Sequence, residues 1–494
     1  MKSAAETAPR TTGSTDESQA AETEQTKPVR WLFAPLRVLW RLFKPVSVEK
    51  QNLLQRRWQD LPDSLRTPNQ VIGKHWVHCG YTLGPAFCSF GCSHCYLPRG
   101  ANRLPMVTLG SMKAQIDAQR RLMGPGGNLQ ITGGDVVEAY WREGRKEELI
   151  EVVRYAVEND LVPMLMTHGQ VLLDHPDYLE RLVLEGGLRK ISVHIDITMA
   201  GRPGFPLRTL ARESDLNALR SRFVQLVLET RRKTGKRLVA AQTVTVTHAN
   251  IDSIGDIIGW LISSTDRLDV CRTLSFQTEA NVGRTRYSSE PVNPATVWQR
   301  LGQATGKALD REHLLFGHPD CSSTATLLVA PSRQQVVNLS SASPEGRLFW
   351  QELMAAFGGI DAKTVRPVSS AMQKVGAILR RPKVALRLLG LFCQMLRARE
   401  LTIGFVGSAL CGNVRGFNLV MHNFMSEDEM AEPRSARALE RLKACAFRGA
   451  ILRDGEWQAV SMCEMNAKLR PEIYRHTRAD QDTAPISLKF PRAD

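Results

Sequence analysis

The chain carries three cysteines within eight residues, in the stretch Phe87-Cys88-Ser89-Phe90-Gly91-Cys92-Ser93-His94-Cys95-Tyr96. This C-x3-C-x2-C spacing lets one loop direct three thiolates toward three corners of a cubane iron–sulfur cluster. The motif supplies no fourth thiolate, so one iron of such a cluster would stay open to another ligand. Zinc would need a fourth protein ligand, and His94 is too close to Cys95 in the chain for easy joint coordination. The stretch therefore predicts a [4Fe–4S] cluster, with zinc or three buried structural thiols as the alternatives.

Alternating strand-like and helix-like segments surround the cysteine stretch. Strands are predicted at residues 75–83, 128–132, 162–167, 190–196, 237–246 and 272–277. Helical patterns lie between them at residues 111–122, 146–158, 178–185, 218–234 and 254–263. This rhythm implies an α/β fold with a parallel sheet, either open or curled into a partial barrel. In such folds the chemistry lies at the carboxyl ends of the strands, and the cysteine stretch follows the first one.

Polar residues also stand at the ends of the later predicted strands. The second strand ends in Thr132-Gly133-Gly134-Asp135, where two glycines allow close backbone approach and the carboxylate can accept hydrogen bonds from an ammonium group. The third ends at Thr167, the fourth at Asp196 and the sixth at Gln277. Each of these residues is a candidate for cofactor binding, and the alternative is a polar side chain that merely caps a strand.

The cysteine motif and its place after a strand resemble the radical S-adenosylmethionine (SAM) superfamily, and the resemblance covers residues 74–289. It implies a (β/α)6 partial barrel and an oxygen-sensitive [4Fe–4S] cluster held by Cys88, Cys92 and Cys95. It also implies that the open iron chelates the amino and carboxyl groups of SAM. Reduction would then cleave SAM to methionine and a 5′-deoxyadenosyl radical that abstracts hydrogen from a substrate. An electron donor of the flavodoxin or ferredoxin type is expected as a partner.

The same resemblance extends to the residues that follow the later strands. Gly133-Gly134-Asp135 is similar to the family's Gly-Gly-Glu, which contacts the methionyl amine of SAM, although Asp shortens the reach by one methylene. Thr167-His168-Gly169 is similar to the family's Thr-Asn-Gly, with His168 as a departure. Asp196 stands where the family often places a residue that contacts ribose. Gln277 lies in the corresponding position after the sixth strand.

Four further cysteines, Cys321, Cys411, Cys445 and Cys463, lie far apart in the C-terminal region. If the fold brings them together, they could bind an auxiliary iron–sulfur cluster. The alternative is a set of ordinary buried cysteines. Their spacing offers no test, because ligands from distant segments meet only through the tertiary structure.

The C-terminal region has a second resemblance. It is carried by His318-Pro319, Cys321, Asn423-Phe424-Met425-Ser426, Arg437 or Arg441, Cys445, Gly455, Cys463 and Asn466. These residues are similar to the C-terminus of tetraether-synthase-like radical SAM proteins. That group joins or modifies lipid alkyl chains, so the resemblance implies a lipid or another membrane-embedded hydrocarbon as substrate. The cysteine-rich N-terminal section of the archaeal enzymes is missing here.

The charge balance favours a polyanionic partner. The chain has 65 Lys and Arg against 50 Asp and Glu, a net charge of +15, which suits either nucleic acid or an anionic membrane surface. Residues 29–44 combine four basic residues in one helical stripe with two tryptophans and two phenylalanines, and residues 369–399 contain seven basic residues and no acidic one before Glu400. Residues 29–44 are predicted to lie in a membrane interface, with packing on the protein's own body as the alternative. Residues 369–399 are a second candidate surface for a membrane or another polyanion, with a solvated charged face as the alternative. No apolar run of about 18 residues predicts a spanning helix.

Four segments are expected along the chain. They are a disordered tail (residues 1–28), a basic amphipathic helical segment (29–70), the radical SAM partial barrel (71–290) and a mixed α+β C-terminal extension (291–494). Clustered cysteines in a long chain favour a reducing cytoplasm, with peripheral attachment to the inner face of the membrane. The leading function is a radical SAM oxidoreductase acting on a lipid. The alternatives are a peptide maturase or radical methylase with an auxiliary cluster, and a zinc module that binds RNA, which the lack of an aromatic-rich nucleic-acid motif disfavours.

Overall fold

The computed structural model describes residues 47–285, 291–309, 314–339, 343–357, 376, 379–453, 455–470 and 487–488. The predicted tail at residues 1–28 and the basic aromatic stretch at residues 29–44 lie outside the described residues. From the rest of the predicted 29–70 segment, helix α3 (Val48–Asp60) is described. It begins at Ser47, whose side chain accepts a hydrogen bond from the backbone N–H of Lys50 and so caps the first turn.

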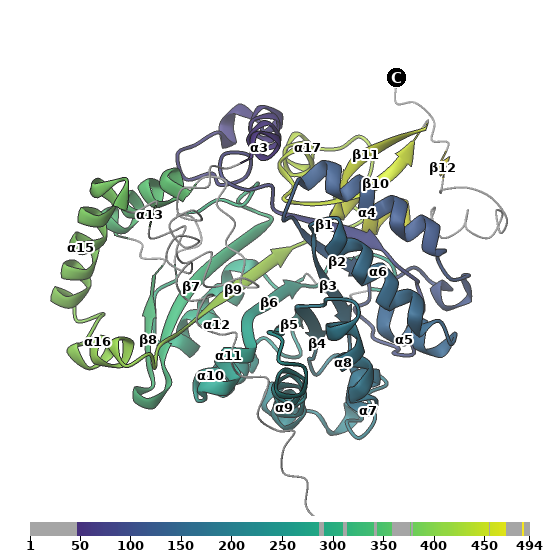
Figure 1. Cartoon of the computed structure of the whole chain (residues 1–494), viewed down its shortest axis with the longest axis horizontal. Coiled ribbons are helices and arrows are strands. Elements are labelled where there is room, and N and C mark those ends of the chain that lie inside the picture. Colours follow the sequence, from purple (N-terminus) through teal and green to yellow (C-terminus); the bar gives the residue numbers. More distant parts are fainter. Residues whose placement is uncertain are drawn as a thin grey trace, which may run out of the picture.

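The described strands form one sheet of twelve strands, in the order β11-β10-β1-β2-β3-β4-β5-β6-β9-β7-β8, with β12 beside β10 (Figure 1). Their bounds are β1 Cys79–Leu83, β2 Asn128–Thr132, β3 Val162–Thr167, β4 Lys190–His194, β5 Val239–Val246, β6 Cys271–Thr278, β7 Ser322–Ala330, β8 Gln335–Asn338, β9 Arg415–Asn423, β10 Phe447–Arg453, β11 Glu456–Ser461 and β12 Ser487–Leu488. The predicted α/β fold with a large parallel sheet is confirmed.

The predicted elements agree closely with the observed ones in the first half of the chain. Strands β2 and β3 and helix α6 have the predicted bounds, because their apolar periodicity is regular from end to end. Strand β1 begins at Cys79, four residues later than predicted. The residues before it form a turn instead, in which the backbone N–H groups of His75 and Trp76 both donate to the carbonyl of Val71.

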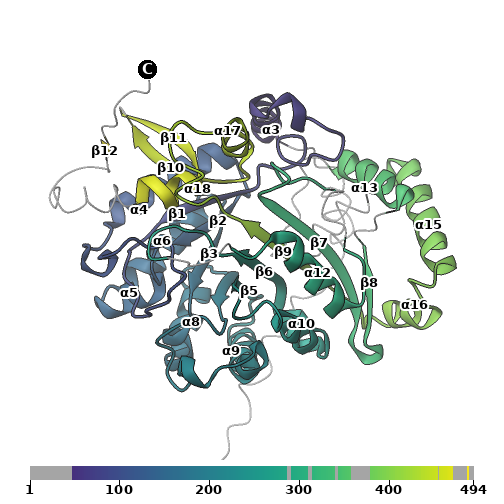
Figure 2. The ribbon, with the colours of Figure 1, turned by 180° about the vertical axis from the view of Figure 1, so that it is seen from behind.

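Helices follow the strands and cover one side of the sheet (Figures 1 and 2). The bounds of the helices after α3 are α4 Leu109–Met123, α5 Val136–Arg142, α6 Lys146–Glu158, α7 Gln170–Asp174, α8 Pro176–Leu184, α9 Asn217–Thr234, α10 Ile254–Ile262, α11 Thr265–Val270, α12 Pro294–Thr305, α13 Pro344–Phe357, α15 Pro382–Arg397, α16 Ile403–Leu410, α17 Ala436–Ala444 and α18 Met462–Glu464. The largest apolar core lies between the strands and the helices of the first half of the chain.

The other face of the sheet is less tightly covered. In β2, for example, Leu129 and Ile131 are buried while Gln130 between them is half-buried, and β6, β7 and β9 alternate in the same way. A parallel sheet covered by helices on one side leaves its second side available for binding, so this pattern suits a fold that holds ligands across its strands.

The C-terminal region completes the sheet on both sides. Strand β10 pairs parallel to β1, and β9 pairs parallel to β6, which gives the parallel row β10-β1-β2-β3-β4-β5-β6-β9. The two flanking strands approach each other, because the rings of His422 in β9 and Phe447 in β10 make an edge contact with 4.8 Å between centroids. The row of parallel strands is therefore strongly curved, and its open side lies where the C-terminal residues gather.

A second apolar core lies at the far edge of the sheet. Helices α13, α15 and α16 pack there beside β7 and β8, and their buried residues include Phe349, Val384, Leu391 and Phe405. None of the helices in the part of the chain that the structure describes has both the length and the apolar composition needed to cross a bilayer.

Candidate functional site

The three motif cysteines lie in an irregular segment, residues 84–98, which we call the cysteine loop. It follows β1 and runs across the carboxyl ends of the neighbouring strands. Backbone hydrogen bonds anchor it at three places: Gly134 N–H donates to the carbonyl of Pro85 (2.8 Å), Gly91 N–H to Ala200 (3.0 Å) and Arg284 N–H to Cys95 (2.9 Å). These contacts join the loop to the segments that follow β2, β4 and β6.

The two glycines after β2 allow this close packing. A Cβ atom on Gly133 would lie 2.3 Å from the carbonyl oxygen of Pro85, and one on Gly134 would lie 2.1 Å from that of Phe87. Real Cβ atoms do not approach backbone oxygens so closely, so no larger residue fits at either position. The sequence pattern predicted glycines that let a cofactor approach, whereas the described atoms against them belong to the cysteine loop. Contact of these glycines with SAM stays a prediction.

Asp135 is held by donors from its own fold. One carboxylate oxygen accepts from the backbone N–H of Glu138 (2.8 Å) and so caps helix α5. The other accepts from the Thr167 hydroxyl (2.7 Å) and from the backbone N–H of His168 (2.6 Å). With 2% of its surface exposed, Asp135 joins the ends of β2 and β3. Thr167, also predicted as a cofactor ligand, is here a donor to Asp135.

His168, which departs from the family pattern, makes the next contact with the cysteine loop. Its ring stacks on that of Phe90, with 3.9 Å between centroids and an interplanar angle of 3°. Its Nε2 lies 3.0 Å from a carboxylate oxygen of Glu138. Glu138 also accepts from the backbone N–H of Ser89 in the loop (2.9 Å). Burial raises the pKa of Glu138, but these hydrogen bonds outweigh it, so the pKa lies below its ordinary value.

The other end of the cysteine loop rests on β6. Nδ1 of His94 lies 2.8 Å from the carboxylate of Glu279, which follows the strand, and the Tyr96 hydroxyl donates to the carbonyl of Thr278 (3.2 Å). His94 is therefore engaged with β6 rather than turned to share a metal ion with Cys95. The loop spans the strand ends from β2 to β6, which brings the motif cysteines over the middle of the parallel row.

The three thiols are half-buried and free of disulfides. Burial raises the pKa of Cys92 to about 12, with Asp196 adding to the effect, and burial and Asp135 raise that of Cys88 further above its usual range. Cys88 and Cys92 therefore stay protonated at neutral pH in the absence of a metal, and metal binding must displace those protons. The residues fit a cluster, because three thiols in one anchored loop match the donor set that iron–sulfur clusters take.

A single-ion site would use a different set of ligands. Within the described residues, Cys88, Glu138 and His168 are the group whose ligand atoms all lie within 4.8 Å of one another. The three thiols do not approach one another that closely as a set.

Beyond the loop, four side chains form a network at the ends of β4, β5 and β6. Asp196, 1% exposed, accepts from the backbone N–H of Thr245 (2.9 Å) and lies 2.9 Å from Nε2 of His194. Gln277 donates to the Thr245 hydroxyl (3.3 Å). Burial raises the pKa of Asp196, but the hydrogen bonds from His194 and its neighbours lower it below the ordinary value. The structure thus brings two predicted cofactor residues, Asp196 and Gln277, into one polar network.

Arg202 is a candidate that sequence patterns did not reveal. It is 5% exposed, and its Nη2 donates to the carbonyls of His168 (3.1 Å) and His194 (3.0 Å), which joins the ends of β3 and β4. Its Nη1 is buried without a hydrogen-bond partner among the described residues. Burial lowers its pKa to about 10, so it remains a cation at neutral pH. Arg202 lies in a stretch with no regular periodicity, and nothing local in the sequence marks it.

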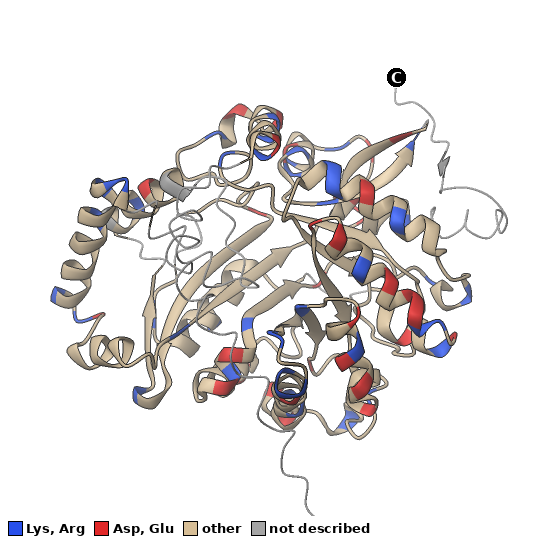
Figure 3. Cartoon of the chain, viewed as in Figure 1, with Lys and Arg blue, Asp and Glu red and all other residues tan. Residues whose placement is uncertain are grey.

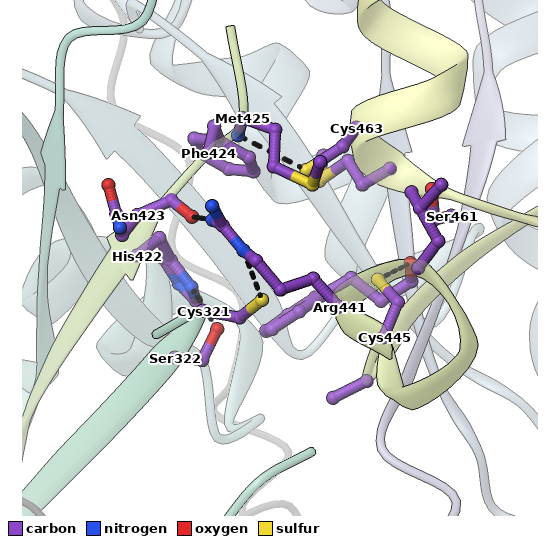
Figure 4. A pocket seen from close by; sticks show the side chains of 14 residues that line it. Cys321, Ser322, His422, Asn423, Phe424, Met425, Arg441, Cys445, Ser461 and Cys463 are labelled. Atoms are coloured by element: carbon purple, nitrogen blue, oxygen red, sulfur yellow. Dashed lines mark hydrogen bonds between the residues drawn. The ribbon is translucent and has the colours of Figure 1, made fainter. Parts of the chain in front are cut away.

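The second set of cysteines is brought together only in part. Cys321, Cys445 and Cys463 line one pocket, together with His422 and Arg441 (Figure 4). Cys411 does not belong to it. This cysteine is exposed at the end of α16, on the opposite side of the molecule from α17 in both ribbon views. The four-cysteine set predicted from sequence is therefore corrected to three.

Comparison with known proteins gives only distant similarity. No family model and no curated protein matches the chain. Among solved structures, native anSMEcpe with bound AdoMet is 12% identical over 40% of this chain and 50% of that chain, with a TM-score of 0.28. A histidine-tagged form of anSMEcpe with bound AdoMet is 10% identical over 67% of this chain and 98% of that chain, with a TM-score of 0.31. The first match spans half the length of anSMEcpe, and neither score is high enough to carry an argument.

Proposed function

We propose that this chain is a radical SAM enzyme whose core [4Fe–4S] cluster is held by Cys88, Cys92 and Cys95. The observation that carries the proposal is the cysteine loop itself, which presents three thiols at the carboxyl ends of a curved parallel row. When reduced, such a cluster supplies the electron that cleaves SAM and yields a 5′-deoxyadenosyl radical able to take hydrogen from a substrate. The large parallel sheet supports the proposal, because a radical SAM fold is built on such a sheet.

The chain's own residues supply the surroundings that SAM needs. Arg202 offers a buried cationic N–H that can bind a carboxylate. Half-buried Gln277 offers its amide to ribose hydroxyls, while Asp196, whose two oxygens are already engaged, holds His194 and Thr245 in place beside it. Asp135, with both oxygens already engaged, holds the ends of β2 and β3 in register beneath the loop. In this assignment the Gly133–Asp135 segment affects SAM binding through its backbone and by holding the cysteine loop in position.

The test is reductive cleavage of SAM by the anaerobically reconstituted full chain. Replacing Cys88, Cys92 and Cys95 together by Ala should abolish 5′-deoxyadenosine formation and remove the core cluster's absorbance. The exposed pair Cys393 and Cys411, both replaced by Ala, is the matched control and should leave cleavage unchanged. Continued formation of 5′-deoxyadenosine in the triple variant would overturn the assignment.

We further propose that the substrate is a membrane lipid. Support comes from α15 and α16 at the edge of the molecule. Helix α15 turns Val384, Leu391 and Met395 inward. Its outward side exposes Leu386 (68%) and Leu389 (61%). Three more apolar side chains extend this surface: Leu396 (41%), Ile403 (87%) and Leu410 (85%). The surface formed by these five exposed side chains is called the α15–α16 surface below.

The charge around the α15–α16 surface suits an anionic bilayer. Residues 379–414 contain six basic residues and one acidic residue, Glu400. Figure 3 shows Lys and Arg near both ends of α15. A basic residue near an anionic membrane contributes about 1 kcal/mol, and inserted leucines add to that. The surface also suits a lipid substrate, because an enzyme must meet such a substrate at the bilayer.

Sedimentation with vesicles tests the membrane proposal. The full chain should sediment with vesicles rich in phosphatidylserine and much less with neutral phosphatidylcholine vesicles. Replacing Leu386 and Leu389 by Glu should reduce the bound fraction several-fold. Val157→Glu/Leu184→Glu, at exposed apolar positions on α6 and α8, is the matched control. In a separate experiment, deleting residues 1–44 measures how much the N-terminal stretch contributes to vesicle binding. A wild-type chain that ignores anionic vesicles would overturn the proposal.

A further inference from the structure

Three free cysteines from distant segments meet in one pocket at the open side of the curved sheet. Cys321 precedes β7, Cys445 follows α17 and Cys463 lies in α18. Figure 4 shows their side chains around that of Arg441. None of the described cysteines forms a disulfide, so the convergence is not a covalent crosslink.

Local structure holds each thiol in place. The backbone N–H of Asn423 donates to the carbonyl of Cys321 (2.7 Å), which ties Cys321 to the end of β9. The side chains of Ser461 and Glu464 form a capping box at the start of α18, which sets the direction of Cys463. Cys445 ends α17, where its backbone N–H donates to Leu442.

Two of the sulfurs already accept hydrogen bonds. Arg441 Nε donates to Sγ of Cys321, and the backbone N–H of Met425 donates to Sγ of Cys463, both at 3.4 Å. N–H donors of this kind stabilise thiolate ligands and tune the reduction potential of iron–sulfur clusters. Cys445 instead donates its proton to the carbonyl of Phe447 (3.0 Å), so this thiol must turn when it loses that proton.

Arg441 supplies the charge that three thiolates require. It is 5% exposed, its Nη2 donates to the carbonyl of Asn423 (2.9 Å), and its Nη1 lies 2.8 Å from Glu429. Nη1 faces the exposed carboxylate of Glu429, whereas Nε faces the thiol of Cys321, where a thiolate would place a second negative charge beside the cation.

Three thiols in one pocket match the donor set that iron–sulfur clusters take. The pocket also adjoins the cysteine loop. Tyr96, next to Cys95, makes an edge contact of 5.3 Å with Phe424, next to Met425. The residue next to Cys95 therefore touches a residue that lines the pocket.

We infer that Cys321, Cys445 and Cys463 hold a second iron–sulfur cluster, with Arg441 beside it as a positioning residue. On loading, each thiol releases its proton to solvent as its sulfur binds iron. The site has three protein thiolates and no fourth among the described residues, because Cys411 lies elsewhere. Its place one ring contact from the cysteine loop suits a role in passing electrons to or from the core cluster. The existence of the site is independent of the proposed function, and only that electron-transfer role rests on it.

The test counts iron and sulfide after anaerobic reconstitution of the full chain with ferrous iron and sulfide. The wild-type chain should hold about eight irons, and the Cys88/Cys92/Cys95→Ala variant about four. Adding Cys445→Ala and Cys463→Ala should remove those four, whereas adding Cys393→Ala and Cys411→Ala should not. The core cluster is already missing from the Cys88/Cys92/Cys95→Ala variant. This loss of iron would therefore be seen whether or not the chain is a radical SAM enzyme. Iron absent from the triple variant, or zinc bound without sulfide, would overturn the inference.

Two further measurements guard against misfolded variants. Cys463→Ser alone, in the otherwise wild-type chain, should lower the iron content from about eight to about four, and adding Cys88/Cys92/Cys95→Ala should remove those remaining four. Arg441→Gln should lower the reduction potential of the second cluster, because a nearby positive charge favours the more negative reduced state. Arg441→Lys should restore most of that potential. An unchanged potential in Arg441→Gln would remove this residue from the site.

Discussion

The ring of His168, at the end of β3, stacks on the ring of Phe90 in the cysteine loop, with 3.9 Å between centroids and an interplanar angle of 3°. Phe90 is 4% exposed and lies between Cys88 and Cys92 in sequence. The contact therefore fixes the middle of the loop against the sheet. Without it, the loop would depend on its backbone hydrogen bonds, those of Ser89 and Gly91 in the middle and those at its two ends.

Phe90→Ala should loosen the loop. Burying a phenylalanine side chain contributes about 3 kcal/mol or more, and much of this would appear as local opening of the loop rather than global unfolding. We expect faster loss of iron to a chelator, measured by absorbance, with a smaller change in melting temperature. Phe90→Leu keeps apolar volume but loses the ring stacking, so its rate of iron loss should lie between those of the wild type and Phe90→Ala. Equal rates of iron loss in all three proteins would contradict this role.

Gly134→Ala should displace the cysteine loop, because its Cβ would lie 2.1 Å from the carbonyl oxygen of Phe87. The expected result is a several-fold loss of reconstituted core iron, measured per folded protein. Gly110→Ala is the control, since a Cβ there meets nothing within 4 Å and helix α4 favours alanine over glycine. Normal iron loading in Gly134→Ala would show that the backbone can give way at this point.

Asp135→Asn separates two roles for that carboxylate. If the carboxylate positions β2, β3 and α5, the variant loses charge-assisted hydrogen bonds. Its free energy of unfolding then falls by about 1–3 kcal/mol, and its SAM affinity falls as well. If it binds the SAM ammonium directly, SAM affinity falls roughly tenfold at unchanged stability. Denaturant unfolding and SAM binding, measured on the same preparations, distinguish these outcomes. The internal hydrogen bonds lead us to expect the first.

Two buried histidines should make stability depend on pH. Burial, with Lys190 adding to it, lowers the pKa of His78 to about 4, and burial, with His78 adding to it, lowers that of His422 to about 4. An unfolded histidine takes a proton below about 6.5, while these folded ones resist until about 4. The free energy of unfolding should therefore be fully present above pH 6.5 and fall toward pH 4, by at most about 3 kcal/mol per histidine.

The variant His78→Phe tests this pH dependence. Its ring can keep the edge contacts with Phe316 and Phe447, and it cannot take up a proton. The slope of unfolding free energy against pH between 6.5 and 4 should become shallower than in the wild type. His248→Phe, at an exposed position, should keep the wild-type slope. Identical slopes in the wild type and His78→Phe would show that folding does not change the pKa of His78.

Sequence patterns predicted the features that depend on neighbouring residues. The bounds of β2, β3 and α6 followed from apolar periodicity alone, because each element is buried on a regular stripe. The motif Cys88, Cys92 and Cys95 likewise needs only a few residues of chain to present three thiols. A helix such as α5 was missed, since its seven residues are too few for a clear pattern and its start depends on the side chain of Asp135.

Only the tertiary structure decided which distant residues meet. Strand β9 pairs with β6, and strand β10 pairs with β1. Both pairings use backbone hydrogen bonds, so the sequence of a strand does not show which strand lies beside it. That pairing brings Cys321, Cys445 and Cys463 around Arg441, and it leaves Cys411 on the far side. Arg202 and the ends of β3 and β4 meet in the same way. The physical reason is that contacts between distant residues form only when the whole curved sheet has packed. The chemical nature of each side chain is fixed by its residue type and can therefore be read from the sequence.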